Sequence, residues 1–329
     1  MSEGPLVSVI TTVRNAEKYI GTAVKSILSQ TYENLEYIIV DDGSDDSTGR
    51  ILNSFESDRR VRLIRFSANI GRVASQNKAL GSVRGKYIAL HDADDISMPD
   101  RIARQVEFME SNIDHAIAGT NIIEIDSRSE ETARTAKPEL NDDLQFIMMF
   151  KCTLSNPSTM FRSDIVLEKG LHYEDRFIHA EDFGFISRLI RFGKAHNIQD
   201  YLLKYRRHED NNSKVNFRQL DASSIEIARQ NLAMLGTDVD SETVRRLRSL
   251  LSSKGISSGH ITGDISALLD IIELFIKKHK PSSKLVILEL LDRMPVWLGR
   301  KNLLLKPGSR AVNNRIRKLK RVLADDGEK

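Results

Sequence analysis

Cysteine is nearly absent from this sequence, because Cys152 is the only one in 329 residues. A single thiol excludes an internal disulfide bond and any zinc site built from several cysteines. Long apolar runs are missing as well, and no stretch approaches the roughly 20 residues that a helix needs to cross a bilayer. Residues 1–5 lack the basic start and apolar core of a signal peptide. These absences predict a cytoplasmic protein that crosses no membrane.

The sequence has little excess charge of either sign. Its 49 Lys and Arg residues against 46 Asp and Glu leave a formal net charge of +3, which gives no reason to expect a nucleic-acid partner. The apolar fraction of 40% and the charged fraction of 29% are typical of a globular protein. The length fits one sizeable α/β domain with an appendage, or two modest domains.

A glycine-rich phosphate loop is missing after the first predicted strand. Dinucleotide-dependent oxidoreductases carry Gly-x-Gly-x-x-Gly there, whereas this chain has Thr-Val-Arg-Asn at 12–15. The missing glycine motif excludes a dinucleotide-dependent oxidoreductase. It also argues against a sugar nucleotidyltransferase, which usually has a glycine-rich loop bearing Arg or Lys at this place. Two function classes nevertheless stay open as alternatives. One is a sugar nucleotidyltransferase, and the other is a non-catalytic module that binds a nucleotide-sugar.

Strand-like and helix-like segments alternate through the first third of the chain. Apolar, β-branched runs predict strands at 6–11, 35–40, 61–66, 86–91 and 115–119, and helical patterns separate them at 16–29, 46–55, 72–83 and 99–111. This alternation predicts a mostly parallel sheet with helices on both faces. We interpret about 120–210 as the part that completes the sheet. From about 215 to 329 the pattern is helical only.

Polar segments follow three of the predicted strands, at 11–15, 41–44 and 92–95. The carboxyl ends of parallel strands meet at one edge of a sheet, so these segments are expected to converge there. Asp92 and Asp94 lie behind a buried strand, where they repel each other and are poorly solvated. A cation or a ligand would compensate that arrangement. Ordinary turn and helix-capping roles are the alternative for each segment.

Other candidate residues lie outside these strand ends. Arg72 could bind phosphate, or simply start a surface helix. The carboxylates of Glu181 and Asp182 could take a proton from an attacking hydroxyl, or complement a helix dipole. His208 could be a metal or phosphate ligand, although a lone histidine is more often a surface or packing residue.

The end of the chain is strongly basic. From 293 to 324 there are ten Lys or Arg residues and no acidic residue. In this basic stretch, a helix over 309–323 would have the apolar residues Val312, Ile316, Leu319 and Leu323 on one face. A basic amphipathic helix suits an anionic membrane surface, so 293–323 is a candidate membrane contact at the inner face of the membrane. A solvated tail is the alternative.

The order and spacing of these motifs resemble the family 2 glycosyltransferases, which have a GT-A fold. The resemblance covers roughly residues 5–210 and is carried by the segments 7–15, 26–31, 41–44, 69–71, 92–95, 156–158 and 181–182. It implies an α/β fold with a mostly parallel central sheet flanked by helices. We expect a GT-A domain over 1–214, with a nucleotide-sugar half to about 120 and an acceptor half from about 121, and an α-helical C-terminal region over 215–329.

The resemblance also implies a reaction and roles for residues. It implies inverting transfer of a sugar from a nucleotide-diphosphate-sugar, with UDP favoured, to a hydroxyl of a glycan or lipid-linked acceptor in polysaccharide or glycolipid biosynthesis. Asp182, with Glu181 beside it, matches the catalytic base. Asp94, Asp92 and His208 match ligands of Mg²⁺ or Mn²⁺. The donor is expected to contact Thr12, Arg14, Asn15, Asp41, Asp42, Arg72, Asn77 and Asp92. The Gln-x-x-Arg-Trp signature of processive members is absent, which predicts single additions.

Overall fold

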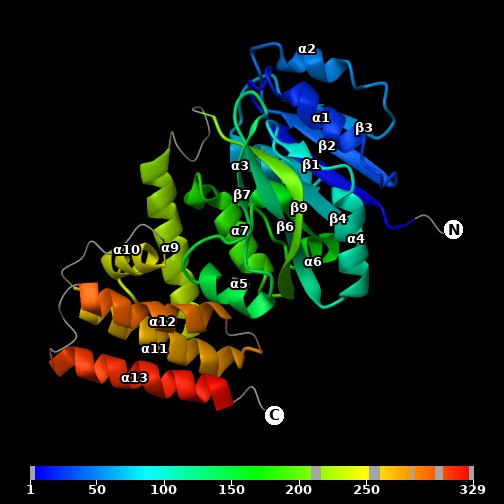
Figure 1. Cartoon of the computed structure of the whole chain (residues 1–329). Helices are drawn as coiled ribbons and strands as arrows, with labels where there is room; N and C mark the ends of the chain where they lie inside the picture. Colours follow the sequence, from blue (N-terminus) through cyan, green and yellow to red (C-terminus); the bar gives the residue numbers. More distant parts are fainter. Residues whose placement is uncertain (1–3, 209–215, 252–259, 283–284, 301–306, 326–329) are drawn as a thin grey trace. The chain divides into compact units, whose positions relative to one another are not determined.

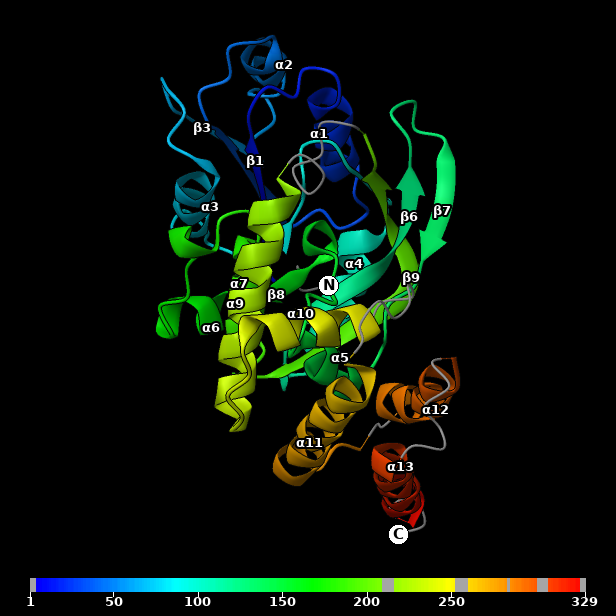
Figure 2. The ribbon, with the colours of Figure 1, turned by 90° about the vertical axis from the view of Figure 1, so that its left-hand side faces the viewer.

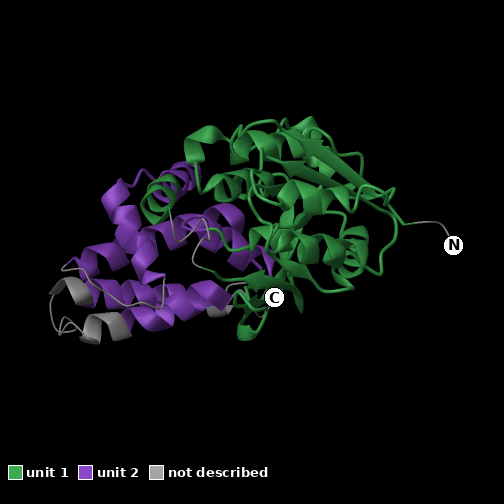
Figure 3. Ribbon diagram, turned by 90° about the horizontal axis from the view of Figure 1, so that it is seen from above, with its two compact units in different colours: residues 1–139, 152–223 green, residues 140–151, 224–329 purple. Residues whose placement is uncertain are grey.

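The structure, a computed structural model, describes residues 4–208, 216–251, 260–282, 285–300 and 307–325. Its contacts divide the chain into two compact units, coloured separately in Figure 3. The first unit comprises 1–139 and 152–223, and the second comprises 140–151 and 224–329. The division into functional domains at 214 stays a prediction.

In the described part of the first unit, nine strands form one mixed sheet (Figure 1). Its order is β3-β2-β1-β4-β8-β6-β9-β5, and β7 pairs with β6. The predicted mostly parallel sheet is confirmed, since β1, β2, β3 and β4 pair in parallel, as do β6 and β9. The strands are β1 Val7–Val13, β2 Leu35–Asp41, β3 Val61–Arg65, β4 Tyr87–Leu90, β5 Ile96–Ser97, β6 His115–Ile125, β7 Glu131–Thr135, β8 Met160–Arg162 and β9 Lys194–Arg206.

Helices pack on both faces of this sheet, and Figure 2 shows α3 and α1 on opposite sides of β1. In α1, Ile20, Val24 and Ile27 recur at helical spacing and are fully buried. They share a core with Val7 and Val9 of β1, so this face of the sheet is apolar throughout. The helices of the first unit are α1 Ile20–Leu28, α2 Thr48–Asn53, α3 Arg72–Leu80, α4 Arg101–Ser111, α6 Ser163–Glu168 and α7 Glu181–Leu189, with 3₁₀ turns η1 Asn156–Ser158 and η2 Asp175–Phe177.

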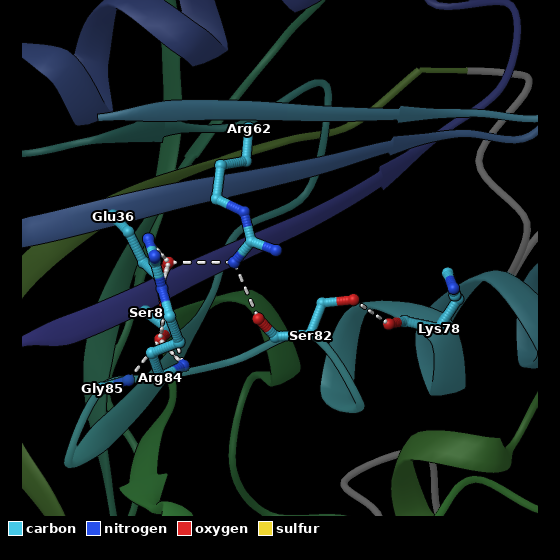
Figure 4. Close-up of polar contacts among 7 residues, drawn as sticks. All are labelled: Ser8, Glu36, Arg62, Lys78, Ser82, Arg84 and Gly85. Atoms are coloured by element: carbon cyan, nitrogen blue, oxygen red, sulfur yellow. Dashed lines mark hydrogen bonds and ion pairs between the residues drawn. The ribbon is translucent and has the colours of Figure 1, made fainter. Parts of the chain in front are cut away.

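A buried carboxylate ties together the strand edge opposite the polar segments (Figure 4). Glu36 of β2 accepts a hydrogen bond from Ser8 Oγ at 2.6 Å and forms ion pairs with Arg62 and Arg84. Ser8 Oγ in turn accepts the Gly85 N–H at 2.8 Å. Burial alone would raise the pKa of Glu36, but these hydrogen bonds outweigh it and lower the pKa. The ionised Glu36 therefore cross-links β1, β2, β3 and the segment before β4.

The second unit is helical in its described residues. Aromatic and aliphatic side chains of α5, α9, α10, α11, α12 and α13 share one apolar core. Asp240 caps α10 by accepting the N–H groups of Glu242 and Thr243. The acidic Asp264 lies in the first turn of α11, which begins at Ile261. The helices are α5 Asn141–Met148, α9 Phe217–Leu235, α10 Ser241–Leu250, α11 Ile261–His279, α12 Leu285–Arg300 and α13 Pro307–Asp325.

The basic amphipathic segment forms α13 and the end of α12, while 301–306 lies outside the described residues. The apolar face of α13, with Val312, Ile316, Leu319 and Leu323, is buried in the core of the second unit. Packing therefore accounts for the amphipathic pattern, and these side chains are not available to insert into a membrane. None of the described helices is long and apolar enough to cross a bilayer.

A glycine substitution tests the turn after β2. Gly43 has a φ of +66°, and a Cβ there would lie 2.5 Å from the carbonyl carbon of Ala68. Gly170 has a φ of +60°, but nothing described lies within 4 Å of its Cβ position. We expect Gly170→Ala to cost about 1–2 kcal/mol for the left-handed backbone, and Gly43→Ala about 2–4 kcal/mol. Urea unfolding of both variants measures the difference, and equal costs would contradict the described turn.

Candidate active site

A pocket of about 1040 Å³ opens at the carboxyl ends of the central strands. The register places Val13 of β1 opposite Asp41 of β2, and Ile10 of β1 opposite Leu90 of β4, so these three strands end at one edge. The pocket is also lined by the start of α7 and the segment after β9. Ten of the predicted site residues line it, namely Thr12, Arg14, Asn15, Asp42, Arg72, Asp92, Asp94, Glu181, Asp182 and His208.

The two other predicted residues do not line the pocket and have structural partners. Asp41 is buried and accepts the N–H of Ser44 at 3.0 Å, which is the turn role considered from the sequence. Asn77 bonds to both backbone groups of Tyr173, donating to its C=O at 2.9 Å and accepting its N–H at 2.8 Å. Asn77 thus anchors the segment before α7 to α3.

Asp42 faces the pocket while it also organises the loop before α3. Its two carboxylate oxygens accept the backbone N–H groups of Ile70 at 2.7 Å and Gly71 at 3.2 Å. Gly71 has a φ of +96°, which suits glycine and turns the chain into Arg72. A carboxylate has about four acceptor sites, so Asp42 retains capacity for a ligand hydroxyl or base N–H.

The loop after β1 is held by reciprocal hydrogen bonds to the turn after β2. Asn15 has a φ of +52°, a conformation that asparagine tolerates. Its side-chain amide donates to Asp45 at 2.7 Å and accepts the Asp45 N–H at 3.0 Å. The neighbouring Arg14 is exposed and lines the pocket. The loop therefore presents Arg14 and Asn15 on a fixed backbone.

Three carboxylates gather after β4. Oxygens of Asp92, Asp94 and Asp95 lie within 4.8 Å of one another. Burial, partly opposed by Arg72 and reinforced by Asp94, raises the pKa of Asp92 to about 6. Burial and its acidic neighbours raise the pKa of Asp95 well above its usual range. Oδ2 of Asp95 is buried without a hydrogen-bond partner among the described residues.

The end of β9 is fastened to this acidic segment. The backbone N–H of Arg206 donates to Oδ1 of Asp95 at 2.8 Å, and Nε of Arg206 donates to the carbonyl of Asp94 at 2.8 Å. Two residues later, Nε2 of His208 lies 2.9 Å from Oδ2 of Asp94. Carboxylate oxygens and an imidazole nitrogen are a donor set that fits a divalent cation such as Mg²⁺ or Mn²⁺. The observed residues therefore fit the expected metal.

Glu181 and Asp182, the first residues of α7, have different surroundings. Glu181 is only 2% exposed and forms an ion pair with Nε of Arg72 at 2.7 Å. Although burial opposes it, the charges of Glu181, Asp92 and Asp182 raise the pKa of Arg72. Asp182 accepts the N–H of Phe183 at 2.7 Å, and burial with the charge of Glu181 raises its pKa to about 6. Asp182 is thus the carboxylate better suited to accept a proton.

Sequence reasoning missed several residues that line the pocket. Lys137 lies just after β7, in a stretch with no apolar pattern to mark it. His179 has a φ of +66° two residues before α7, which no sequence signal indicates. Asn156 of η1 also lines the pocket, and its segment contributes to the family resemblance without an implied role. Arg207 follows β9 and pairs with Glu124 at 3.0 Å.

Comparison with known proteins identifies the family. The family model described as "Glycosyl transferase family 2" matches residues 8–168. An uncharacterised glycosyltransferase of Haemophilus influenzae is 36% identical over 242 residues, covering 70% of this chain and 75% of that protein. The chain belongs to glycosyltransferase family 2. A second relative, the O-antigen biosynthesis glycosyltransferase WbnJ of Escherichia coli, is 30% identical over 215 residues, covering 64% of this chain and 82% of WbnJ.

A solved structure supports the fold of this family 2 glycosyltransferase. TarS 1–349 of S. aureus in complex with UDP-GlcNAc superposes with a TM-score of 0.59. The match covers 95% of this chain and 91% of that one, at 17% sequence identity. The GT-A fold predicted from the motifs is confirmed, as is the prediction that the chain is a glycosyltransferase.

Protonation of Asp182 predicts a pH-dependent stability. Folding raises the pKa of Asp182 from 3.8 to about 6, so ionisation of this carboxyl lowers the stability of the folded protein. The loss of stability is complete above pH 6 and absent below about pH 4. Asp182→Asn removes that penalty. It should raise the midpoint of thermal unfolding by about 2–4 °C at pH 7.5, with a smaller gain at pH 4.5.

Asp164 provides a matched control for this measurement. It also occupies the second position of a short helix, α6, and accepts the next N–H at 2.7 Å, but it is exposed. Asp164→Asn should give no pH-dependent gain. A destabilised Asp182→Asn variant at pH 7.5, or a gain that is equal at both pH values, would contradict the assigned environment of Asp182.

Proposed function

We propose that this family 2 glycosyltransferase is an inverting enzyme that transfers one sugar from a nucleoside-diphosphate-sugar to a hydroxyl group. Asp182 would be the catalytic base. Asp92, Asp94 and His208 would hold a divalent cation, and Thr12, Arg14, Asn15, Asp42 and Arg72 would contact the donor. The observation that carries this proposal is that Asp42, Asp94 and Asp182, far apart in sequence, line one pocket.

The surroundings of Asp182 suit proton transfer from an acceptor hydroxyl. A hydroxyl is a weak nucleophile until a base removes its proton, and a base with a pKa of about 6 is largely ionised at neutral pH. The N–H of Phe183 fixes one oxygen of Asp182. In a single displacement, the acceptor oxygen bonds to the anomeric carbon as the bond to the diphosphate breaks, which inverts the configuration. Asp182 would receive the hydroxyl proton in that step.

Glu181 would act differently from Asp182, since its charge is committed to Arg72. The ion pair of 2.7 Å holds the Arg72 side chain beside the acidic cluster. A planar guanidinium binds phosphate oxygens well, so Arg72 would contact the diphosphate of the donor. We therefore interpret Glu181 as a residue that positions Arg72 rather than as a second base.

The carboxylates after β4 would serve the leaving group. A divalent cation bound there would neutralise the negative charge that develops on the departing diphosphate. Asp92 and Asp94 would supply oxygen ligands, and His208 lies next to Asp94. Asp95 is anchored to β9 and would keep the segment in place.

We propose a UDP-sugar as the donor and a glycan or lipid-linked acceptor, in cell-surface polysaccharide or glycolipid biosynthesis. The UDP-GlcNAc complex of the structural neighbour supports the donor, and the O-antigen role in the name of the E. coli relative supports the pathway class. The absence of the Gln-x-x-Arg-Trp signature from the sequence supports single additions. We also propose that the protein is peripheral at the inner face of the membrane. Because the apolar face of α13 is buried, its contact with anionic lipids would be electrostatic, through the exposed residues Arg317, Lys318 and Arg321.

A donor panel with a base-deficient variant tests the proposed function. Wild-type protein with Mn²⁺ and each of several UDP- and GDP-sugars should release nucleoside diphosphate from one donor class. Asp182→Asn should bind that donor within about threefold of wild type but transfer at least about 100-fold more slowly, because the general base is lost. Asp164→Asn should transfer normally. Donor binding without turnover in wild type would favour the non-catalytic binding module, and normal transfer by Asp182→Asn would overturn the base assignment.

A further inference from the structure

The pocket contains a half-buried cation that the proposed mechanism does not use. Lys137 lines the pocket from the segment after β7. Its backbone N–H donates to Oδ1 of Asn121 at 2.9 Å and its carbonyl accepts from Gln199, so the backbone of Lys137 is fixed on both sides. Within the described part of the chain, the ammonium group has neither a hydrogen bond nor an ion pair. A partly desolvated ammonium without a counter-charge is unfavourable.

The neighbouring charges do not compensate Lys137. Glu124 of β6 is half-buried, and its charge raises the pKa of Lys137. One of its oxygens pairs with Arg207 at 3.0 Å, and the other accepts from Thr135 Oγ1 at 2.9 Å. Glu124 and Arg207 cancel each other's charge, so the three side chains together carry one positive charge. Burial lowers the pKa of Lys137, which agrees with an uncompensated ammonium.

Lys137 lines the same pocket as Asp182, the proposed catalytic base. Burial raises the pKa of the Cys152 thiol, and the charge of Asp182 raises it further while the charge of Lys137 lowers it. Apolar side chains of Ile122 and Leu154 line the pocket with them. The donor residues Arg14 and Asp42 come instead from the ends of β1 and β2, at the opposite end of the sheet order from β6 and β7.

We propose that Lys137 forms an anion subsite, so that the acceptor of this enzyme carries a carboxylate or phosphate group near the hydroxyl that is glycosylated. This inference rests on the proposed function and specifies its acceptor. The ammonium binds the anionic group, and the Glu124–Arg207 pair forms the neighbouring wall. An acceptor held in this way keeps its hydroxyl within reach of Asp182, whereas a neutral acceptor leaves the ammonium unpaired.

Direct binding measurements test this subsite without knowledge of the natural acceptor. Protein saturated with Mn²⁺ and UDP is titrated with methyl glucuronide, glycerol 3-phosphate and methyl glucoside, and each Kd is measured by ligand-observed NMR. Wild type should bind at least one anionic probe about 10- to 100-fold more tightly than the neutral glucoside, as expected for a hydrogen bond to a charged group. The anionic probe with the lower Kd shows whether the subsite prefers a carboxylate or a phosphate group on the acceptor.

Three variants separate the role of Lys137 from changes in folding or total charge. Lys137→Met should abolish the preference, and Lys137→Arg should keep most of it. Lys25→Met, which removes an exposed lysine of α1 outside the pocket, should keep it fully. Equal binding of charged and neutral probes by wild type, or a preference that survives in Lys137→Met, would overturn the proposal. Failure of wild type to bind UDP would instead count against the proposed function, so the two outcomes are distinct.

Discussion

The site depends on one electrostatic constraint, which is the gathering of like-charged carboxylates at the end of β4. Asp92, Asp94 and Asp95 are brought within 4.8 Å of one another because a buried strand delivers them directly to the sheet edge. Such repulsion costs free energy unless positive groups or ligands offset it. Arg206 fastens the segment to β9, while Arg101, fully buried, donates to the carbonyl of Leu90 at 2.9 Å. The surrounding structure thus holds the three carboxylates together despite their mutual repulsion.

The central strands and their helices could be predicted because each has a strong local pattern. Continuous apolar runs mark β1, β2 and β4, and helical spacing of apolar residues marks α1. Parallel pairing then brings Thr12, Asp42 and Asp92 to one edge without further information. By contrast, β7 is almost entirely exposed and has no apolar period, and β5 has only two residues. Lys137 follows β7 and was missed for the same reason.

Neighbouring acidic residues could not be distinguished from the sequence. In the pair 41–42 the side chains point to different surroundings, so Asp42 reaches the pocket and Asp41 closes a turn. At the start of α7, Glu181 is neutralised by Arg72, an interaction over 109 positions that no local pattern reveals. Likewise, the amphipathic pattern of α13 indicated an apolar face but not its partner, and that face packs within its own unit.

The central claim is that strand ends far apart in sequence surround one cation and one nucleoside diphosphate. Anomalous diffraction from crystals soaked with Mn²⁺ and UDP tests it most directly. The account predicts a manganese peak at about 2.0–2.4 Å from a carboxylate oxygen of Asp94, with the UDP diphosphate on the same ion. Manganese bound away from Asp92 and Asp94, or UDP bound outside the pocket between Asp42 and Asp182, would contradict it.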